Sequence, residues 1–309
     1  MFKSDVRIIV SMLYRTGFDM GSISLSILGV SQDGGIPQAG CGCKRCMDAH
    51  ENVNLRKFPV SCAIMGIDNS FHIIEVSRLL SEQLKIASEI FDLGTLRTPD
   101  SVIITHGHLG HIDGLGLFGK EVMGLKDVPL ISSSKVIKLL EKRGIAEPFV
   151  CHDLVPGKRI EPTRGCGFFI ELLKVPHRDE ETDTHAVIIR GPDKSILFLP
   201  DHDSWNETLK ISGTKDIREF LEHIKVDIAF IDGTFWDENE LIDRQMKEIP
   251  HPTISETLEL LGNRMNDDPE IFFLHLNHTN PANDEDSDQS KKINSMGWGV
   301  ASQGSIFSL

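Results

Sequence analysis

Short runs in which apolar and polar residues alternate recur along most of the chain, and they are rich in β-branched side chains. Such runs predict strands, at 22–28, 61–67, 71–76, 101–106, 168–175, 185–191, 195–201, 226–233, 270–277 and 300–309. Helical spacing of apolar residues predicts helices between them, at 79–91, 113–125, 134–143, 215–224 and 253–264. Because strands outnumber helices about two to one and often follow one another directly, we expect two packed sheets with helices outside. The pattern favours one α/β domain over residues 1–309, with 1–21 as an N-terminal extension.

Charge and composition narrow the classes of partner. The chain of 309 residues carries a formal net charge of −14, which repels polyanions and disfavours nucleic acid as a partner. No apolar run approaches the roughly 18 residues of a membrane helix, and the first residues lack the pattern of a signal peptide. We therefore expect a cytoplasmic protein that makes no membrane contact and acts on a small-molecule substrate. The sequence does not specify the oligomeric state, and a homodimer is compatible with it.

Three histidines lie within six positions at the end of one predicted strand. His106 and His108 are two apart on a segment expected to be extended, so their imidazoles project to the same side and can share one ion. The chain then turns into the predicted helix 113–125, which brings His111 back toward the same point. Neutral imidazole is the commonest metal ligand, and a buried strand gives it a rigid mount. This density predicts a metal site; the alternative is three histidines that solvate a loop.

Other His and Asp residues stand at the ends of further predicted strands. His177 lies just past one strand, and Asp201 ends another, where its carboxylate can bridge two ions. His202 should point away from Asp201 on an extended segment, and we leave it out of the site. His275 and His278 are three apart and face opposite sides of an extended chain, so they should not serve the same ion. One can face the histidine cluster and the other a cysteine cluster near the N-terminus.

That cysteine cluster is the stretch GCGCKRC, which contains Cys41, Cys43 and Cys46. The three thiols are too close together to pair with one another, and an intracellular chain favours thiolate ligation of zinc over disulfides. The alternative is a surface loop with free thiols. The remaining cysteines lie in apolar runs and should be core residues; they are Cys62, Cys151 and Cys166.

The arrangement of metal-ligand candidates resembles the metallo-β-lactamase fold superfamily, whose signature is HxHxDH followed by a lone His, a bridging Asp and a final His. The resemblance covers nearly the whole chain and implies a four-layer αβ/βα sandwich. The matching positions are His106, His108, His111, His177, Asp201 and His275.

Within the superfamily the chain most resembles the pyrroloquinoline-quinone biosynthesis protein B group, on the stretches LGVSQDGGIPQAGCGCKRC, FIDGTFWDENEL, IPHP and HLNHTNPANDEDS. It is also similar to the phosphonate-operon cyclic phosphodiesterase and, more distantly, to ribonuclease Z. In those phosphodiesterases a CxCxxC loop and a His from an HxxH segment form a structural zinc site. The resemblance therefore implies a closed structural zinc site made by Cys41, Cys43, Cys46 and His278.

The chain departs from the superfamily signature at Gly110, which stands where HxHxDH has its Asp. By the resemblance, the first metal site keeps all its residues, which are His106, His108, His177 and Asp201. The second site keeps three, which are His111, Asp201 and His275. Three protein ligands plus water still make a normal open site. We expect one firmly bound ion and a second that is weaker or absent, and Gly110→Asp should then tighten binding of the second ion.

The ligand set predicts a metal-dependent hydrolase with one or two ions of zinc, manganese or iron. Metal-bound hydroxide would attack a phosphodiester, ester or lactone of a small molecule, with Asp201 among the catalytic residues. A general acid must protonate the leaving group, and His251 is the candidate because ribonuclease Z-like enzymes place a catalytic His in a comparable region. Its alternative role is to flank the helix 253–264. Asp232 ends a buried strand and can orient a metal ligand, or it can serve a turn.

Two other classes of function are compatible with the same residues. Histidines with one carboxylate can hold iron, and the resemblance to quinone-biosynthesis proteins implies oxidation or hydroxylation of a tyrosine-derived intermediate as one alternative. The other is a non-catalytic carrier of a small ligand, in which the metals only hold loops. This chain keeps histidines that the quinone-biosynthesis proteins often lack, which favours metal-dependent catalysis.

Overall fold

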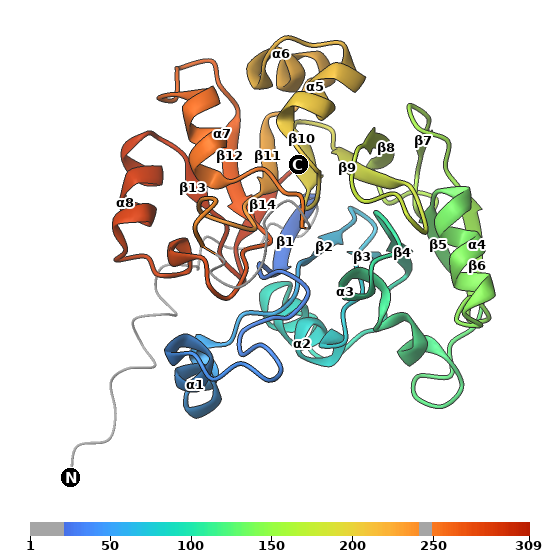
Figure 1. Ribbon diagram of the computed structural model, residues 1–309. Coiled ribbons are helices and arrows are strands. Elements are labelled where there is room, and N and C mark those ends of the chain that lie inside the picture. Colours follow the sequence, from blue (N-terminus) through green and yellow to red (C-terminus); the bar gives the residue numbers. More distant parts are fainter. Residues whose placement is uncertain (1–21, 241–248) are drawn as a thin grey trace.

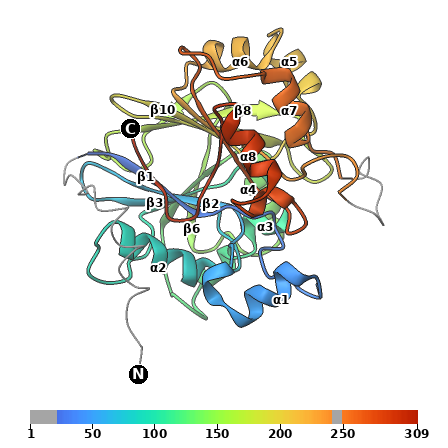
Figure 2. The same cartoon turned by 90° about the vertical axis from the view of Figure 1, so that its left-hand side faces the viewer.

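The computed structural model describes residues 22–240 and 249–309, and its core is a pair of β-sheets stacked face to face with helices on both outer faces (Figure 1). Seen edge-on, the layers follow the order helix, sheet, sheet, helix (Figure 2). The expected four-layer αβ/βα sandwich is therefore confirmed. The expected extension over 1–21 lies outside the described residues.

The first sheet has seven strands. In spatial order these are β14 (Ile306–Ser308), β1 (Ser24–Gly29), β2 (Ser61–Met65), β3 (Phe71–Ile74), β4 (Ser101–Ile103), β5 (Val128–Ser132) and β6 (Phe149–Asp153). Strands β3 to β6 are parallel, whereas β2 is antiparallel to both β1 and β3. Strands β1, β3 and β4 therefore run in the same direction, and their carboxyl ends share one edge of the sheet.

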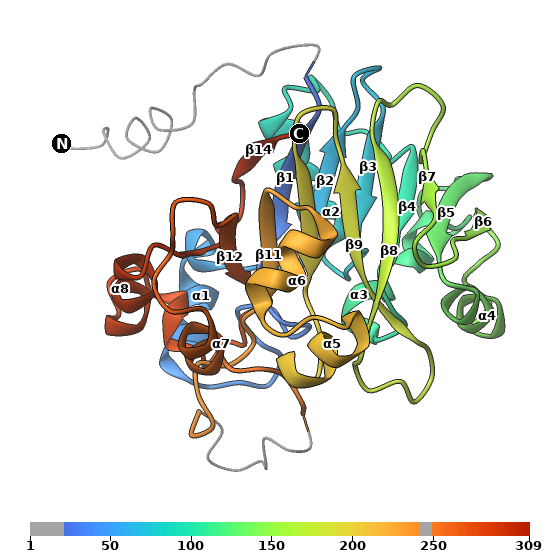
Figure 3. The same ribbon diagram turned by 90° about the horizontal axis from the view of Figure 1, so that it is seen from above.

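The second sheet also has seven strands and lies over the first (Figure 3). Their order is β13 (Gly299–Val300), β12 (Glu270–Leu274), β11 (Ile228–Asp232), β10 (Ser195–Leu199), β9 (Thr184–Arg190), β8 (Phe169–Val175) and β7 (Arg159–Ile160). Strands β10 to β13 are parallel, and β9 is antiparallel to both β8 and β10. Strands β8, β10, β11 and β12 thus share a direction.

Apolar side chains fill three layers. Between the sheets lie residues such as Phe168, Phe198 and Phe230. The outer face of the first sheet packs under helices α2 (Leu80–Ile90) and α4 (Ser134–Lys142). The outer face of the second packs under α5 (Trp205–Ser212), α6 (Ile217–Ile224), α7 (Ile254–Leu261) and α8 (Asp288–Ser295). The other helical elements of the described residues are α1 (Lys44–Glu51), α3 (Leu109–Ile112) and the 3₁₀ turns Val53–Leu55, Leu115–Phe118 and Pro281–Asn283.

The predicted helix over 113–125 is wrong. Helix α3 ends at Ile112, and a 3₁₀ turn at Leu115–Phe118 is the only further helical piece in that range. Gly114 and Gly124 explain the difference. A Cβ on Gly114 would lie 2.1 Å from the Ser77 carbonyl oxygen, and Gly124 has a φ of 63°, in the left-handed region that a helix cannot contain.

Two other sequence expectations need correction. The predicted strand 300–309 is two strands, β13 and β14, which belong to different sheets. Strands β5, β6 and β7 and helices α1, α5 and α8 were not predicted. The expected burial of the scattered cysteines holds for Cys62 and Cys166, whereas Cys151 is only partly buried. No helix among the described residues is long and apolar enough to cross a membrane.

Candidate metal centre

The segments that follow strands β1, β3, β4, β8, β10, β11 and β12 converge at one end of the sandwich. Because these strands run in the same direction within each sheet, their carboxyl ends lie along shared edges. The polar side chains that meet there are Asp33, Glu75, His106, His108, His111, His177, Asp201, Asp232, His251 and His275. All the histidines predicted for the active site are in this group.

One set of ligand atoms comes from His106, His108 and His177, which lie within 4.8 Å of one another. His106 Nε2 is 3.0 Å from His108 Nδ1, so the two imidazoles converge as the extended spacing predicts. Asp201 Oδ1 is 3.7 Å from His177 Nε2. This geometry suits one ion held by three imidazoles and a carboxylate.

A second set lies on the other side of Asp201. His111 Nε2 is 3.2 Å from Asp201 Oδ2, and His275 Nε2 is 3.6 Å from Asp201 Oδ1. The Asp201 carboxylate thus lies between the two sets, where sequence reasoning places a bridging residue. Asp33, which sequence reasoning missed, also belongs to this set: its Oδ1 is 3.4 Å from His111 Nε2.

Four of the histidines have a polar partner at Nδ1 that fixes the orientation of the ring. These pairs are His106 with Thr105 Oγ1 at 2.8 Å, His111 with Glu75 Oε2 at 3.2 Å, His177 with Asp203 Oδ1 at 3.2 Å and His275 with Thr234 Oγ1 at 2.9 Å. In each case Nε2 is left to face the centre. Metal-binding histidines commonly have such a partner on the ring nitrogen that does not bind the ion. His108 is the exception, because its Nδ1 faces the centre. Sequence reasoning identified none of these partners.

Two residues of the centre have an unusual backbone conformation. Glu75 and His275 have φ values of 65° and 64°, in the left-handed region that non-glycine residues seldom adopt. Such conformations cost about 1–3 kcal/mol each and persist where surrounding packing enforces them. Both residues follow the last position of a buried strand, so the strain turns their side chains toward the site.

The protonation states of His106 and His108 suit metal binding. Burial lowers the pKa of His106 well below its usual value and that of His108 to about 4, so both imidazoles are neutral. Burial opposes charge on His111 too, but the nearby Glu75 and Asp201 carboxylates outweigh it and raise the His111 pKa. The centre therefore combines neutral nitrogen ligands with an excess of negative charge.

Four buried atoms of the centre have no hydrogen bond. Glu75 Oε2 and His111 Nδ1 lie 3.2 Å apart without the geometry of a hydrogen bond, and the other two atoms are Asp201 Oδ2 and His275 Nε2. A buried polar atom left unpaired costs about 1–3 kcal/mol. A cation between the Asp201 carboxylate and the His275 imidazole satisfies both of these last two atoms at once. Together with the donor set of imidazole and carboxylate, this shows that the residues present fit one or two divalent ions.

His251 and Asp232 form a pair beside the two ligand sets. His251 Nδ1 is 2.6 Å from Asp232 Oδ2, and Asp232 Oδ1 accepts hydrogen bonds from Thr234 N and Oγ1. Burial opposes charge on His251, but Asp232 outweighs burial and raises the His251 pKa. His202, which we left out, is buried elsewhere with Nδ1 2.8 Å from Thr208 Oγ1. The structure thus brings all three predicted catalytic residues, Asp201, Asp232 and His251, to the centre.

Comparison with known proteins settles the family. Residues 75–276 match the model described as the beta-lactamase superfamily domain. The chain belongs to the metallo-β-lactamase superfamily. It is 25% identical over 315 aligned positions to a coenzyme PQQ synthesis protein B from Ruegeria pomeroyi, covering 91% of this chain and 98% of the relative.

Two solved structures of metallo-β-lactamase-fold proteins resemble the whole described fold. Zn²⁺-bound PqqB from Methylobacterium extorquens has a TM-score of 0.68 at 19% identity, covering 93% of this chain and 100% of that one. A diphosphatase from the PhnP family has a TM-score of 0.63 at 20% identity, covering 93% and 97%. These likenesses confirm the fold suggested by the sequence.

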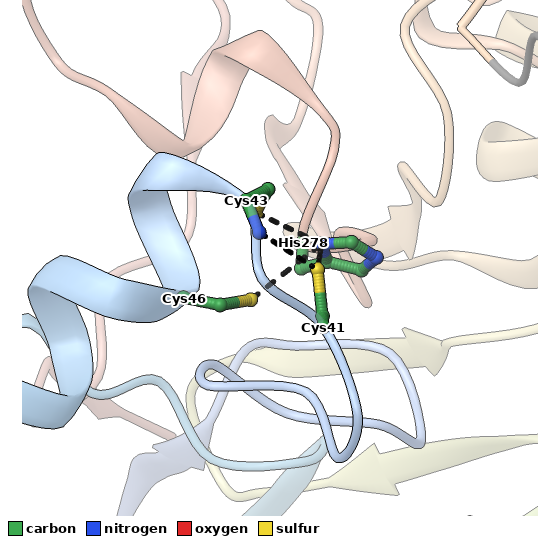
Figure 4. Close-up of side chains that lie close together, drawn as sticks. All are labelled: Cys41, Cys43, Cys46 and His278. Carbon is green, nitrogen blue, oxygen red and sulfur yellow. Dashed lines mark hydrogen bonds between the residues drawn. The ribbon is translucent and has the colours of Figure 1, made fainter.

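The chain also brings three cysteines and a histidine together (Figure 4), in a cluster separate from the main centre. His278 Nδ1 is 3.6 Å from Cys41 Sγ, 3.7 Å from Cys43 Sγ and 3.6 Å from Cys46 Sγ. Zinc at about 2.3 Å from sulfur and 2.0 Å from nitrogen gives a tetrahedral S···N separation of about 3.5 Å. The four side chains therefore have the spacing of a closed zinc site. His275 and His278 face different clusters, as their spacing predicts.

A cavity of about 630 Å³ opens beside the main centre of this metallo-β-lactamase fold. Its lining includes Asp33, Arg78, His251, Asn277 and His278. The cavity is large enough for a small molecule, and polar side chains line much of it. Because Asn277 and His278 directly follow the segment with His275, the cavity wall joins the main centre to the Cys₃His cluster.

Proposed function

We propose that this protein is a metal-dependent hydrolase that cleaves a phosphodiester, ester or lactone bond in a small molecule. The observation that carries the proposal is the convergence of two imidazole sets on one shared carboxylate, Asp201, with the His251–Asp232 pair at the same cavity. When bound, divalent ions supply Lewis acidity and lower the pKa of a coordinated water. His106, His108 and His177 would hold one ion, and His111 and His275 the other.

His251 is proposed as the general acid. Its Nδ1 bonds to Asp232, so the ring is held in one orientation and Nε2 is left for the substrate side. Asp232 is fully buried and raises the His251 pKa, which favours the protonated form that a general acid needs. Asp232 thus acts as a positioning residue through His251.

The relatives support hydrolysis without defining the substrate. One similar structure, at 20% identity, is that of a diphosphatase from the PhnP family, which is the reason to test phosphate-containing substrates first. The curated relatives are named for coenzyme PQQ synthesis, which keeps iron-dependent oxidation as the alternative to exclude by experiment.

The test is elemental analysis of the purified protein followed by assays of the metal-loaded enzyme. We expect zinc or manganese in the main centre and cleavage of bis(p-nitrophenyl) phosphate, p-nitrophenyl acetate or a lactone, without oxygen uptake. Iron with oxygen consumption on phenolic substrates would instead establish the oxidase. A protein that binds metals yet turns over none of these substrates would favour the ligand carrier.

The role of His251 predicts an effect that depends on the leaving group. His251→Ala should lower kcat about 10²–10⁴-fold for a dialkyl or lactone substrate, whose poor leaving group needs a proton. The same variant should change kcat much less for bis(p-nitrophenyl) phosphate, because nitrophenolate leaves without protonation. Asp232→Asn should show the same dependence in weaker form. Equal losses for both substrate types would assign His251 to binding or structure.

A further inference from the structure

We propose that Asp33, in the loop after β1, is the carboxylate ligand of the second ion and replaces the Asp that the superfamily signature has at position 110. The inference rests on the proposed metal centre and adds a ligand that comes from a different part of the chain. It predicts that the second site is complete, in contrast to the vacancy expected from Gly110.

Distances support the assignment. Asp33 Oδ1 lies 3.4 Å from His111 Nε2 and 3.5 Å from His275 Nε2. Ligand atoms about 2.1 Å from a tetrahedral ion are separated by about 3.4 Å. The three ligand atoms therefore have the mutual spacing of one coordination sphere, and Asp201 Oδ2, 3.2 Å from His111 Nε2, completes a set of four.

The space at Gly110 gives independent support. A Cβ on Gly110 would lie 2.2 Å from Asp33 Cγ and 2.3 Å from Asp33 Oδ1, closer than atoms that are not bonded can approach. The Asp33 carboxylate thus occupies the volume that a side chain at 110 would fill. Because Gly110 has no side chain, there is room for the Asp33 carboxylate at this position.

The loop that carries Asp33 is tied to the segment that carries His275. Gln32 N donates to Leu276 O at 3.0 Å, and Leu276 N donates to Val30 O at 2.9 Å. Ser31 Oγ also donates to Leu276 O. These bonds extend a β-like pairing from one sheet to the other, so they hold the carboxylate and the imidazole in register before any ion binds.

The exposure of the three side chains places Asp33 at the open side of the second site. His111 and His275 are each 1% exposed, whereas the Asp33 side chain is 31% exposed and lines the 630 Å³ cavity. A ligand in this position lies between the second ion and the substrate cavity. Replacing it should alter metal uptake without removing a core side chain.

The test measures metal binding, not turnover. Metal-free protein is titrated with Zn²⁺ against a chromophoric chelator, and bound ions are counted by mass spectrometry after gel filtration. Wild type should bind three ions per chain: one at the Cys₃His cluster and two at the main centre. Asp33→Asn keeps the shape of the side chain and should weaken binding of the last ion at least about 100-fold. Loss of a residue that only contacts a metal ligand already lowers metal affinity about 10–100-fold. Asp193→Asn, in the exposed turn between β9 and β10, is the matched control and should bind as wild type does.

Each outcome separates this inference from the proposed function. Three ions with unchanged affinity in Asp33→Asn would overturn the role of Asp33 and leave the metal centre intact. Two ions in wild type, one of them at the main centre, would overturn the second site but not the hydrolase. A wild-type main centre that binds no ion would overturn both.

Substitutions at position 110 provide a second, structural test. Gly110→Ala adds only a methyl group in helix α3, yet it should displace the Asp33 carboxylate and weaken the last ion. Gly110→Asp alone should therefore not tighten binding, which is the opposite of the result expected from the sequence. The double variant Asp33→Gly with Gly110→Asp returns the carboxylate to its usual position and should bind the last ion within about tenfold of wild type. Unchanged binding in Gly110→Ala would contradict the proposal.

Discussion

Asp201→Asn should lower kcat/KM at least about 10³-fold while leaving the metal-free fold intact. The substitution keeps the volume of the side chain but removes the charge that lies within 3.7 Å of His177, His111 and His275. Both proposed ions lose a ligand at once, so the effect should exceed the 10²–10³-fold loss typical of removing one group that stabilises transition-state charge. Steady-state kinetics and bound-metal counts measure the loss of activity and of metal, and thermal melts of the metal-free protein measure whether the fold is intact.

Two companion variants make this test specific. His108→Ala should give a loss of similar size, because it removes a ligand of the first ion. Asp203→Asn should give a smaller loss in metal affinity, about 10–100-fold, because Asp203 contacts His177 at Nδ1 and not at the nitrogen that faces the ion. Full turnover in both Asp201→Asn and His108→Ala would contradict the metal-dependent mechanism.

Much of the centre was predictable because its residues end buried strands. A run of apolar residues that stops at a His or Asp marks the point where the chain leaves the sheet, and parallel strands bring such points together. This reasoning located His177, Asp201 and His275, which lie far apart in sequence. It also placed His106 and His108 on one side of the chain, as the 3.0 Å distance from His106 Nε2 to His108 Nδ1 confirms.

Asp33 escaped the same reasoning because of its surroundings. It lies four residues past Gly29, the end of β1, in a glycine-containing loop that reads as a simple turn. Its contact with His111 and His275 depends on the pairing of Ser31 with Leu276, across 245 positions of sequence. One signal in the sequence could have identified Asp33. Gly110 removes the carboxylate of the superfamily signature, so a replacement carboxylate is expected after another strand that ends at the same edge of the sheet.

The prediction of a helix over 113–125 failed because of the residues within that stretch. The strands that were not predicted depend instead on pairing with other parts of the chain. Four glycines between 114 and 124 outweigh the apolar spacing in that stretch. By contrast, β6 forms one edge of its sheet with β5 beside it, and β5 contains Pro129. Their strand conformation depends on pairing with β4 and with each other, which no local pattern shows.

Cys43→Ala should remove one zinc ion per chain and lower the melting temperature by about 4–16 °C. The Cys₃His cluster ties the loop before α1 to the segment after β12, so a bound ion acts as a cross-link between residues 46 and 278. Cross-links that close long loops stabilise proteins by about 2–4 kcal/mol, and 1 kcal/mol corresponds to about 2–4 °C in larger domains. The three hydrophobic layers do not include the cluster, so the rest of the fold should persist.

The matched control is Cys151→Ala, which removes a partly buried thiol in β6 that belongs to no metal cluster among the described residues. It should keep the full zinc count and melt much closer to wild type. Hydrogen exchange should show faster opening of 41–51 in Cys43→Ala but not in the control. Because His275 lies three residues before His278, Cys43→Ala should also weaken the last ion at the main centre. A variant that melts like wild type with an unchanged zinc count would show that the four side chains hold no structural ion.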